Sequence, residues 1–257
     1  MGKLSAIEWT EATWNPWHGC RKVSPGCAHC YMYREKRQYG QDPAAVVRSR
    51  TTFFAPLGWR QPKLIFTCSW SDFFIEEADA WRRDAWEVMR MTPHHTYQIL
   101  TKRPERILAN IPGGWPLPNV WLGVSVESPR FYERIVTLRN IPSVVRFLSL
   151  EPLLAPVPDV PLDGISWVIV GGESGPRCRT MSPEWVREIR EKCIRVGVPF
   201  FFKQWGGARK DLQGRLLDGR IWNQMPRLAT RARTEIPVLR GCDVDQPRNL
   251  AKSVTVE

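Results

Sequence analysis

Short apolar runs rich in β-branched and aromatic residues recur along the chain. They span residues 7–14, 63–70, 95–101, 119–127, 144–151, 165–173 and 198–205. Several of these runs are almost continuously apolar instead of alternating, which is typical of strands buried on both faces of a parallel sheet. The pattern therefore predicts a sheet built from these seven segments.

Segments with helical spacing and many charged residues lie between the predicted strands. They span residues 27–40, 76–90, 103–110, 129–140 and 182–197. In the second segment the apolar residues form one stripe, made of Ala78, Trp81, Ala85, Trp86 and Met89. Because strands and helices alternate, the sequence favours an α/β protein with a parallel sheet or barrel.

Two segments depart from this alternation. Residues 153–164 are rich in proline, so they predict a loop in place of a helix, and such a loop could act as a lid. Residues 206–257 contain many arginines and little periodicity. We therefore expect a barrel domain over residues 1–205 and an irregular basic extension, packed on the barrel, over residues 206–257.

The composition is that of a globular protein. The chain has 257 residues, of which 43% are hydrophobic and 25% charged, and this length suits one barrel-sized domain. No apolar run approaches the roughly 20 residues that a membrane-spanning helix needs, and the first residues lack the apolar core of a signal peptide. We expect no membrane partner and a cytoplasmic location.

The formal charge of +11 favours a polyanionic partner such as DNA or RNA. Residues 21–50 contain seven basic residues and two acidic ones. Phosphate groups would be attracted to this segment. The charge is equally compatible with a basic surface that serves solubility alone.

Polar residues follow nearly every predicted strand. They are Ser69, Ser71 and Asp72; Thr101 and Lys102; Ser125 and Glu127; Ser149 and Glu151; Gly171, Gly172 and Glu173; Lys203 and Gln204. Parallel α/β proteins carry their chemistry in the loops at the carboxyl ends of the strands, so these residues predict a functional site there. Taken singly, Asp72 or Glu127 could instead cap the helix that follows.

Three of the seven cysteines form a compact motif, C-x6-C-x2-C, at Cys20, Cys27 and Cys30. The motif follows the first predicted strand and precedes the first predicted helix. In a reducing compartment these thiols point to a metal site or to catalysis instead of a disulfide framework. The other cysteines are scattered at Cys68, Cys178, Cys193 and Cys242.

Two kinds of metal site compete for the motif. A structural zinc site needs four protein ligands in a closed tetrahedron, and only His18 or His29, both awkwardly close to the cysteines, could be the fourth. An iron–sulfur cluster is held by thiolates. Three cysteines on a cubane leave one iron open for a substrate or cofactor, so the motif favours a cluster over zinc.

The motif resembles the cluster loop of radical S-adenosylmethionine enzymes. That family has the spacing C-x3-C-x2-C, and this sequence carries three extra residues in the first gap. Over residues 5–226 the segments WTEATWNPWHGCRKVSPGCAHCY, LTKRPER, GVSVES, LSLEPLL, VIVGGESG, FFKQWG and LDGRIWNQMP are similar to the phage-type three-cysteine protein family, which is found in phage and bacterial genomes. The resemblance implies a partial or near-complete (β/α) barrel of the radical S-adenosylmethionine type, with a [4Fe-4S] cluster.

The resemblance also implies roles for residues near the cluster. Cys20, Cys27 and Cys30 would hold it. In the family an aromatic residue beside the third cysteine lies near the adenine of S-adenosylmethionine, and His29 takes that place here with Tyr31 close by.

Further cofactor contacts follow from the same resemblance. They are Ser69, Ser71 or Asp72 for the methionine amino group, Ser125 and Glu127 for the ribose and carboxylate, and Gly171, Gly172 and Glu173 in a glycine-rich strand end. The candidates for substrate contact and catalysis are Lys102, Arg103, Glu151, Lys203, Gln204 and Trp205.

The predicted function is that of a [4Fe-4S] enzyme that makes a 5′-deoxyadenosyl radical from S-adenosylmethionine and modifies or repairs a nucleic-acid base. Such an enzyme needs an external electron donor, and a partner protein could bring its substrate. Two alternatives remain: the same chemistry on a small molecule or peptide, and a non-enzymatic, metal-stabilised nucleic-acid-binding protein. Trp14, Trp17, Trp59, Trp70 and Trp205 are candidate faces for an unstacked base.

Overall fold

The structure is a computed structural model that describes residue 5, residues 7–209 and residues 214–226. Residues 1–226 form one compact unit. Of the predicted extension, only residues 206–209 and 214–226 are described, and residues 227–257 lie outside the described part.

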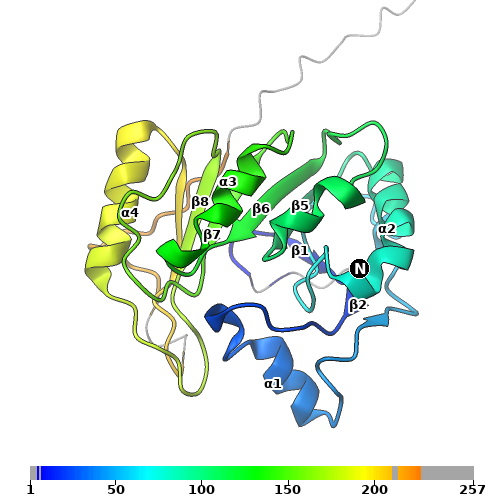
Figure 1. The fold of residues 1–257 in the computed structure, drawn as a ribbon, viewed down its shortest axis with the longest axis horizontal. Helices are drawn as coiled ribbons and strands as arrows, with labels where there is room; N and C mark the ends of the chain where they lie inside the picture. The colour runs from blue at the N-terminus through cyan, green and yellow to red at the C-terminus, as the bar shows by residue number, and fades with distance from the viewer. Residues whose placement is uncertain (1–4, 6, 210–213, 227–257) are drawn as a thin grey trace, which may run out of the picture. The chain divides into compact units, whose positions relative to one another are not determined.

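Seven strands form a single parallel sheet that curls into a half-barrel (Figure 1). They are β1 (Ala12–Trp14), β4 (Leu64–Thr67), β5 (Thr96–Thr101), β6 (Val120–Ser125), β7 (Arg146–Leu150), β8 (Trp167–Gly171) and β9 (Phe200–Gln204). The strands lie in this order in the sheet, and each is parallel to its neighbours. All seven predicted strands are thereby confirmed, and the carboxyl ends lie together at one mouth.

A second, antiparallel pair of strands was not predicted. It consists of β2 (Trp17–His18) and β3 (Val47–Arg48). Each strand has two residues, which is too short to show a period of two in the sequence. This pair follows β1 directly, so it fixes the start of the segment that carries the cysteines.

Within the described residues, four α-helices lie in the segments between strands. They are α1 (Tyr31–Gln38), α2 (Asp79–Met91), α3 (Glu133–Arg139) and α4 (Pro183–Val196). The short 3-10 helices are η1 (Pro25–Cys27), η2 (Ala55–Gly58), η3 (Glu76–Ala78), η4 (Pro104–Arg106), η5 (Leu108–Asn110) and η6 (Pro129–Phe131). Figure 1 shows α1 below the sheet, apart from α2, α3 and α4.

The prediction of a helix over residues 103–110 is wrong, because the segment forms only the two 3-10 helices η4 and η5. Pro104 begins the segment and Pro112 follows it closely, so there is little room for a regular helix. The Asn110 amide also donates a hydrogen bond to the Arg106 carbonyl oxygen at 2.8 Å. Such local side-chain bonds compete with helix formation.

The apolar stripe of α2 packs on the sheet as predicted. Ala78, Ala85, Trp86 and Met89 are buried in the main core, and Trp81 packs partly against it. Arg82, on the same helix, is also buried, which the periodicity did not predict. Its guanidinium donates hydrogen bonds to two backbone carbonyl oxygens and pairs with Asp79 at 2.6 Å, and these bonds compensate for its desolvation.

Residues 153–164 form the loop that their prolines predict. Their apolar side chains, Leu153, Val157, Val160 and Leu162, are buried in the same core as the helices. The segment therefore takes the place of a helix against the sheet and does not lie over the mouth as a lid.

An aromatic cluster fills the amino-terminal end of the half-barrel interior. It is formed by Trp9, Trp121, Val145, Phe147, Trp167, Ile169 and Phe201, with Phe66 and Leu100 packed against it. Gly123 makes room for this cluster, since a Cβ atom there would lie 2.4 Å from the Phe147 ring. The interior is thus closed at the amino ends of the strands and open at their carboxyl ends.

The described part of the carboxyl-terminal segment packs against β9 and β8. The Phe202 amide donates to the Trp222 carbonyl oxygen at 2.9 Å, and the Trp167 indole donates to the Gln224 carbonyl oxygen at 2.8 Å. Leu217 and Trp222 are buried. Among the described residues, no helix has the length and apolar character needed to cross a membrane.

Candidate metal and cofactor site

The three motif cysteines lie on one loop between β2 and α1, at the mouth of the half-barrel. The loop starts at Gly19, whose backbone φ of +95° and close approach to the Ala45 carbonyl oxygen leave no room for a side chain. Cys27 ends η1, and Cys30 immediately precedes α1. All six cysteines within the described residues are free thiols.

Cys20, Cys27 and Cys30 line one cavity of about 630 Å³. The cavity lies at the carboxyl ends of the strands. Its other polar lining includes His29, Tyr31, Ser69, Ser71, Asp72, Lys102, Ser125, Ser149, Glu151, Gly172, Glu173, Lys203 and Gln204. The structure thus brings most of the predicted site residues together around the cysteines.

Three predicted residues, Glu127, Gly171 and Trp205, do not line the cavity. Glu127 is completely buried behind the cysteine loop, and Gly171 is buried at the end of β8. Trp205 packs against the core, so none of the three is placed to touch a ligand in the cavity.

Asp72 and Arg103 hold the first end of the cysteine loop. The Arg103 guanidinium lies 3.1 Å from an Asp72 carboxylate oxygen and donates to the Arg21 carbonyl oxygen at 2.9 Å. Thr101 and the Lys102 amide also donate to Asp72, at 2.6 and 2.9 Å. Asp72 therefore orients Arg103 against the loop.

The charges of Arg103 and Asp72 act on Cys20 in opposite directions. Burial and the Asp72 charge raise the pKa of Cys20 to about 12, while Arg103 acts in the opposite direction. An uncompensated thiolate is costly in a buried position, and a nearby guanidinium or a bound metal lowers that cost. Cys20 is thus placed to ionise when a cation binds beside it.

Glu127 holds the middle of the loop from behind. The Ser24 hydroxyl donates to one of its oxygens at 2.6 Å, and Arg134 on α3 lies 3.1 Å from the other. Gly26 lies directly on Glu127, because a Cβ atom at Gly26 would be 2.3 Å from the carboxylate. Lys102 adds a weaker ion pair at 3.6 Å.

Glu173 and Arg179 hold the part of the loop next to the last cysteines. Glu173 accepts hydrogen bonds from the Arg179 backbone and guanidinium and pairs with His29 Nδ1 at 2.9 Å. Arg179 also donates to the Pro25 carbonyl oxygen at 2.9 Å. Burial alone would raise the pKa of Glu173, but the bonds from Arg179 and His29 lower it to about 2.

Hydroxyl groups complete the attachment of the loop. Ser71 donates to the Gly19 carbonyl oxygen at 2.6 Å, Tyr31 donates to the Ser69 carbonyl oxygen, and Tyr33 donates to the Cys20 carbonyl oxygen. Four strand ends therefore fix the loop through side chains that the sequence analysis offered mainly as cofactor contacts.

The wall formed by β7 and β9 carries a separate polar group. Lys203 donates to Glu151 at 2.6 Å, and the Gln204 amide lies 3.5 Å from the same Glu151 oxygen and donates to Ser174 at 2.7 Å. Within the described residues, this group makes no hydrogen bond to the cysteine loop. It is the part of the cavity wall that no loop anchor occupies.

The sequence analysis missed several residues of this site. They are Asn15, Ser24, Cys68, Arg134, Ser174 and Arg179. Cys68 lines the cavity with the three motif cysteines and has a positive φ of 65°. Its position directly after a predicted strand was an available signal, whereas the pairing of Arg179 with Glu173 depends on a turn that no periodicity predicts.

The base-stacking candidates are mostly unsuited to that role. Trp14 and Trp17 are buried in the core, and Trp59 and Trp205 are partly buried against it. Of the candidates only Trp70 lines the cavity, together with Trp9, Phe66 and Tyr31.

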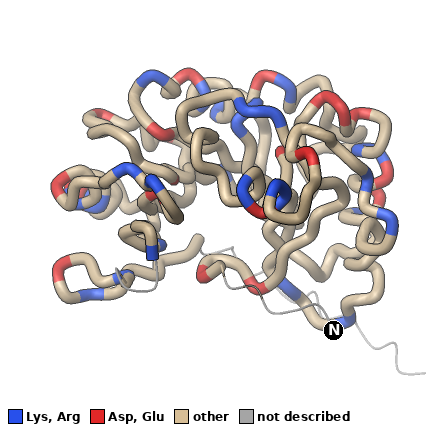
Figure 2. Tube along the Cα trace, turned by 90° about the horizontal axis from the view of Figure 1, so that it is seen from below, with Lys and Arg blue, Asp and Glu red and all other residues tan. Residues whose placement is uncertain are grey.

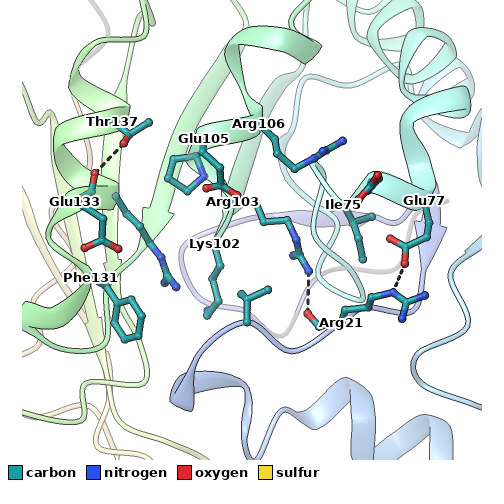
Figure 3. A pocket seen from close by; sticks show the side chains of 14 residues that line it. Arg21, Ile75, Glu77, Lys102, Arg103, Glu105, Arg106, Phe131, Glu133 and Thr137 are labelled. Carbon is teal, nitrogen blue, oxygen red and sulfur yellow. Dashed lines mark hydrogen bonds and ion pairs between the residues drawn. The ribbon is translucent and has the colours of Figure 1, made fainter.

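A second cleft, of about 790 Å³, lies on the outer side of the mouth. Figure 3 shows its walls, with Phe131, Glu133 and Thr137 on one side, Ile75, Glu77 and Arg106 on the other, and Lys102, Arg103 and Glu105 between them. Arg21, Val23, Lys102 and Arg103 line both this cleft and the cavity. Since none of the motif cysteines lines the cleft, the candidate site is the cavity.

The described surface has charges of both signs. In the view of Figure 2, lysines and arginines are interspersed with aspartates and glutamates along the chain. A basic character is therefore a local property, and the sequence concentrates it in residues 21–50 and in residues 206–257.

These features define a class: a parallel half-barrel whose first loop carries three cysteines into a polar cavity at the mouth. The chain belongs to the family described as a protein of unknown function (DUF5131), whose model matches residues 4–226. No curated protein and no solved structure matches the chain.

Proposed function

We propose that the protein is a radical S-adenosylmethionine enzyme with a [4Fe-4S] cluster, of the phage-type three-cysteine kind, acting on a nucleic-acid base. One observation carries the proposal: Cys20, Cys27 and Cys30 line a single cavity at the carboxyl-end mouth of a parallel half-barrel. Catalytic loops of parallel α/β proteins lie at this end of the sheet.

The arrangement of thiols suits a cluster better than a single zinc ion. Tetrahedral zinc, with Zn–S bonds of about 2.3 Å, brings its thiolates to about 4 Å from one another. A closed structural zinc site also needs four protein ligands, and the motif supplies three cysteines. On a cubane each thiolate binds a different iron, so three sulfurs that share a larger cavity suffice.

When bound, the cluster and S-adenosylmethionine supply a 5′-deoxyadenosyl radical that abstracts a hydrogen atom from the substrate. Cys20, Cys27 and Cys30 would hold the cluster as thiolates, and the Arg103 charge favours the ionised form of Cys20. The hydroxyl groups of Ser69, Ser71 and Ser125, and the side chains of His29 and Tyr31, remain the candidates for S-adenosylmethionine contact, since all of them line the cavity. The aromatic cluster below closes the interior to water.

A nucleic-acid base is the substrate that the cavity lining favours. Trp70, Trp9 and Phe66 offer aromatic faces, and Lys102, Glu151, Lys203 and Gln204 offer polar contacts. A base inside a barrel must be single-stranded or flipped out of a duplex. The basic residues of the segment from 21 to 50 would attract the phosphates.

A second candidate, the same chemistry on a small molecule or peptide, is favoured by the mixed surface charge in Figure 2. In either case the reduced cluster requires an external electron donor. A non-enzymatic, metal-stabilised nucleic-acid-binding protein is the third candidate.

Anaerobic reconstitution with iron and sulfide tests the proposal. The wild-type protein should take up iron and sulfide and form 5′-deoxyadenosine from S-adenosylmethionine and a reductant. Cys27→Ala should lose both properties, whereas Cys178→Ala, which changes a half-buried thiol outside the cavity lining, should retain them. A wild-type protein that binds zinc but no iron and sulfide would contradict the proposal.

A steep salt dependence of DNA or RNA binding separates the first candidate from the second, because released counterions dominate such binding. A substrate nucleic acid should bind much more weakly as salt rises, and Arg21→Ala or Lys22→Ala should reduce the slope. An affinity that does not change with salt would favour the small-molecule candidate.

A further inference from the structure

The strand ends carry four buried or partly buried carboxylates, and only one of them is free of the cysteine loop. Asp72 contacts the loop through Arg103, and Glu127 accepts a hydrogen bond from Ser24 of the loop. Glu173 pairs with His29 of the loop and with Arg179. Glu151, at the end of β7, makes no hydrogen bond to that loop among the described residues. It lines the cavity beside Lys203 of β9.

Glu151 and Lys203 form a close ion pair that leaves further hydrogen-bonding groups on both side chains unused within the described residues. Glu151 accepts hydrogen bonds from Lys203 at 2.6 Å and from Gln204 at 3.5 Å, and both reach the same oxygen, Oε1. Within the described part of the chain no hydrogen bond or ion pair engages Oε2. The Lys203 ammonium group has three N–H donors, and one of them donates to Glu151.

The pair is held in place inside the cavity wall. The side chains are 19% and 16% exposed. Gly171 of the neighbouring strand leaves space for the carboxylate, because a Cβ atom there would lie 3.1 Å from Glu151 Oε1. Gln204 is fixed in turn by its bond to Ser174 at 2.7 Å. The wall therefore presents an acceptor oxygen next to N–H donors, with little freedom to rearrange.

This alternation of acceptor and donor complements a ring N–H beside a ring carbonyl, the lactam edge of guanine, hypoxanthine, uracil and thymine. Adenine has no carbonyl group, and cytosine has no ring N–H next to its carbonyl group. The aromatic lining from Trp9, Phe66 and Trp70 supplies the flat apolar surface that a ring needs.

We infer that Glu151 and Lys203 form a recognition pair for the lactam edge of a nucleobase, with Glu151 accepting from the ring N–H and Lys203 donating to the ring carbonyl. The inference rests on the proposed function in taking a base as the substrate. It adds which bases the site accepts and which two side chains select them.

Binding of free nucleosides to the full-length protein tests the pair without any radical chemistry. Inosine and uridine are titrated by calorimetry, with 1-methylinosine, 3-methyluridine, adenosine and cytidine as comparisons. The lactam nucleosides should bind at least about 10-fold more tightly than the others, because only they offer a ring N–H beside a ring carbonyl to the two side chains. Equal binding of the methylated nucleosides, or no binding of inosine and uridine at millimolar concentration, overturns the inference.

Two variants assign the selectivity to the pair. Glu151→Leu removes both acceptor oxygens, and Lys203→Met removes the N–H donors; each should reduce the lactam preference about 10-fold. Glu105→Gln, on an exposed carboxylate outside the cavity, should leave it unchanged. If either variant fails to fold, the comparison of methylated and unmethylated nucleosides on the wild-type protein still decides.

The inference and the proposed function can fail separately. Lactam-selective binding in a protein that assembles no cluster keeps the recognition pair and ends the radical-enzyme proposal. Cluster assembly and cleavage of S-adenosylmethionine without lactam selectivity keeps the enzyme proposal and ends the recognition pair.

Discussion

At the scale of single residues, the site depends on charged side chains whose partners lie far away in the sequence. Glu127, Glu173 and Asp72 each appear in the sequence as isolated acids at strand ends. In the structure each is paired with an arginine and bonded to the cysteine loop or to a residue that contacts it. Buried charges of this kind are tolerated because they are paired and hydrogen-bonded.

Gly26→Ala should loosen the cysteine loop. The added Cβ atom would lie 2.3 Å from Glu127, and that carboxylate cannot move aside because Ser24 and Arg134 hold it. Overpacking of this kind costs about 1–3 kcal/mol. Thiol-reagent labelling should show faster reaction of the loop cysteines, and Gly58→Ala, where nothing lies within 4 Å, should leave both labelling and stability unchanged.

Glu173→Gln should make stability less sensitive to acid. The pKa of Glu173 in the folded protein, about 2, lies below the ordinary glutamate value of 4.5, so the unfolded chain binds more protons between these two pH values. The stabilisation from Glu173 is therefore complete above about pH 4.5 and is lost as the pH falls toward about 2.

Urea unfolding across this pH range measures the effect. At pH 7 the wild-type protein should be more stable than Glu173→Gln by about 2–3 kcal/mol, the usual scale for a buried hydrogen-bonded charge. The difference should shrink steadily below pH 4.5. A difference that stays constant down to pH 2.5 would show that the ion pair with Arg179 does not carry the stabilisation.

At the scale of elements, the sheet requires small residues where aromatic side chains crowd its interior. Gly123 of β6 faces the Phe147 ring of β7 in an aromatic cluster that also contains Trp121 and Trp167. Cores packed at this density respond to a single added methyl group.

Gly123→Ala should destabilise the half-barrel by about 1–3 kcal/mol, because the new Cβ atom would lie 2.4 Å from the Phe147 ring. Phe147→Leu in the same chain removes the clashing ring edge and should recover part of the loss. Thermal unfolding of the single and double variants measures both effects. If Phe147→Leu and Gly123→Ala destabilise additively, the two side chains do not clash.

The elements also show where sequence patterns fail. The seven strands of the parallel sheet, which have three to six residues, were predictable because each lies within a longer run rich in apolar residues. The strands β2 and β3 have two residues each and depend on their pairing with one another. The segment from residue 103 to residue 110 has helical spacing, but prolines and the Asn110 side chain reduce it to 3-10 turns.

At the scale of the whole molecule, one compact unit ends at residue 226. The family match ends at the same residue. Within this unit, residues 214–226 complete the packing of β8 and β9 through Trp222 and Gln224. A boundary drawn at residue 205 would remove these contacts.

A chain that ends after Pro226 should therefore fold and unfold at the same temperature as the full chain. A chain that ends after Trp205 exposes Phe202 and Trp167 to solvent and should be less stable or insoluble. Circular dichroism and thermal unfolding of the two truncated proteins make the comparison. Equal stability of both would mean that residues 206–226 contribute nothing to the core.

The sequence by itself determined the strands, most helices and the cysteine motif. Each of these depends on neighbours within about fifteen residues, and hydrophobic periodicity can be recognised over that range. The tertiary structure alone decided which strand-end acids anchor the loop and which one, Glu151, is left to face the cavity. The difference arises because Arg103, Arg134 and Arg179 pair with the other three acids in the folded protein. The periodicity of the sequence does not show such pairs. The cysteine motif at Cys20, Cys27 and Cys30 therefore indicates the chemistry of the site, while the fold determines its geometry.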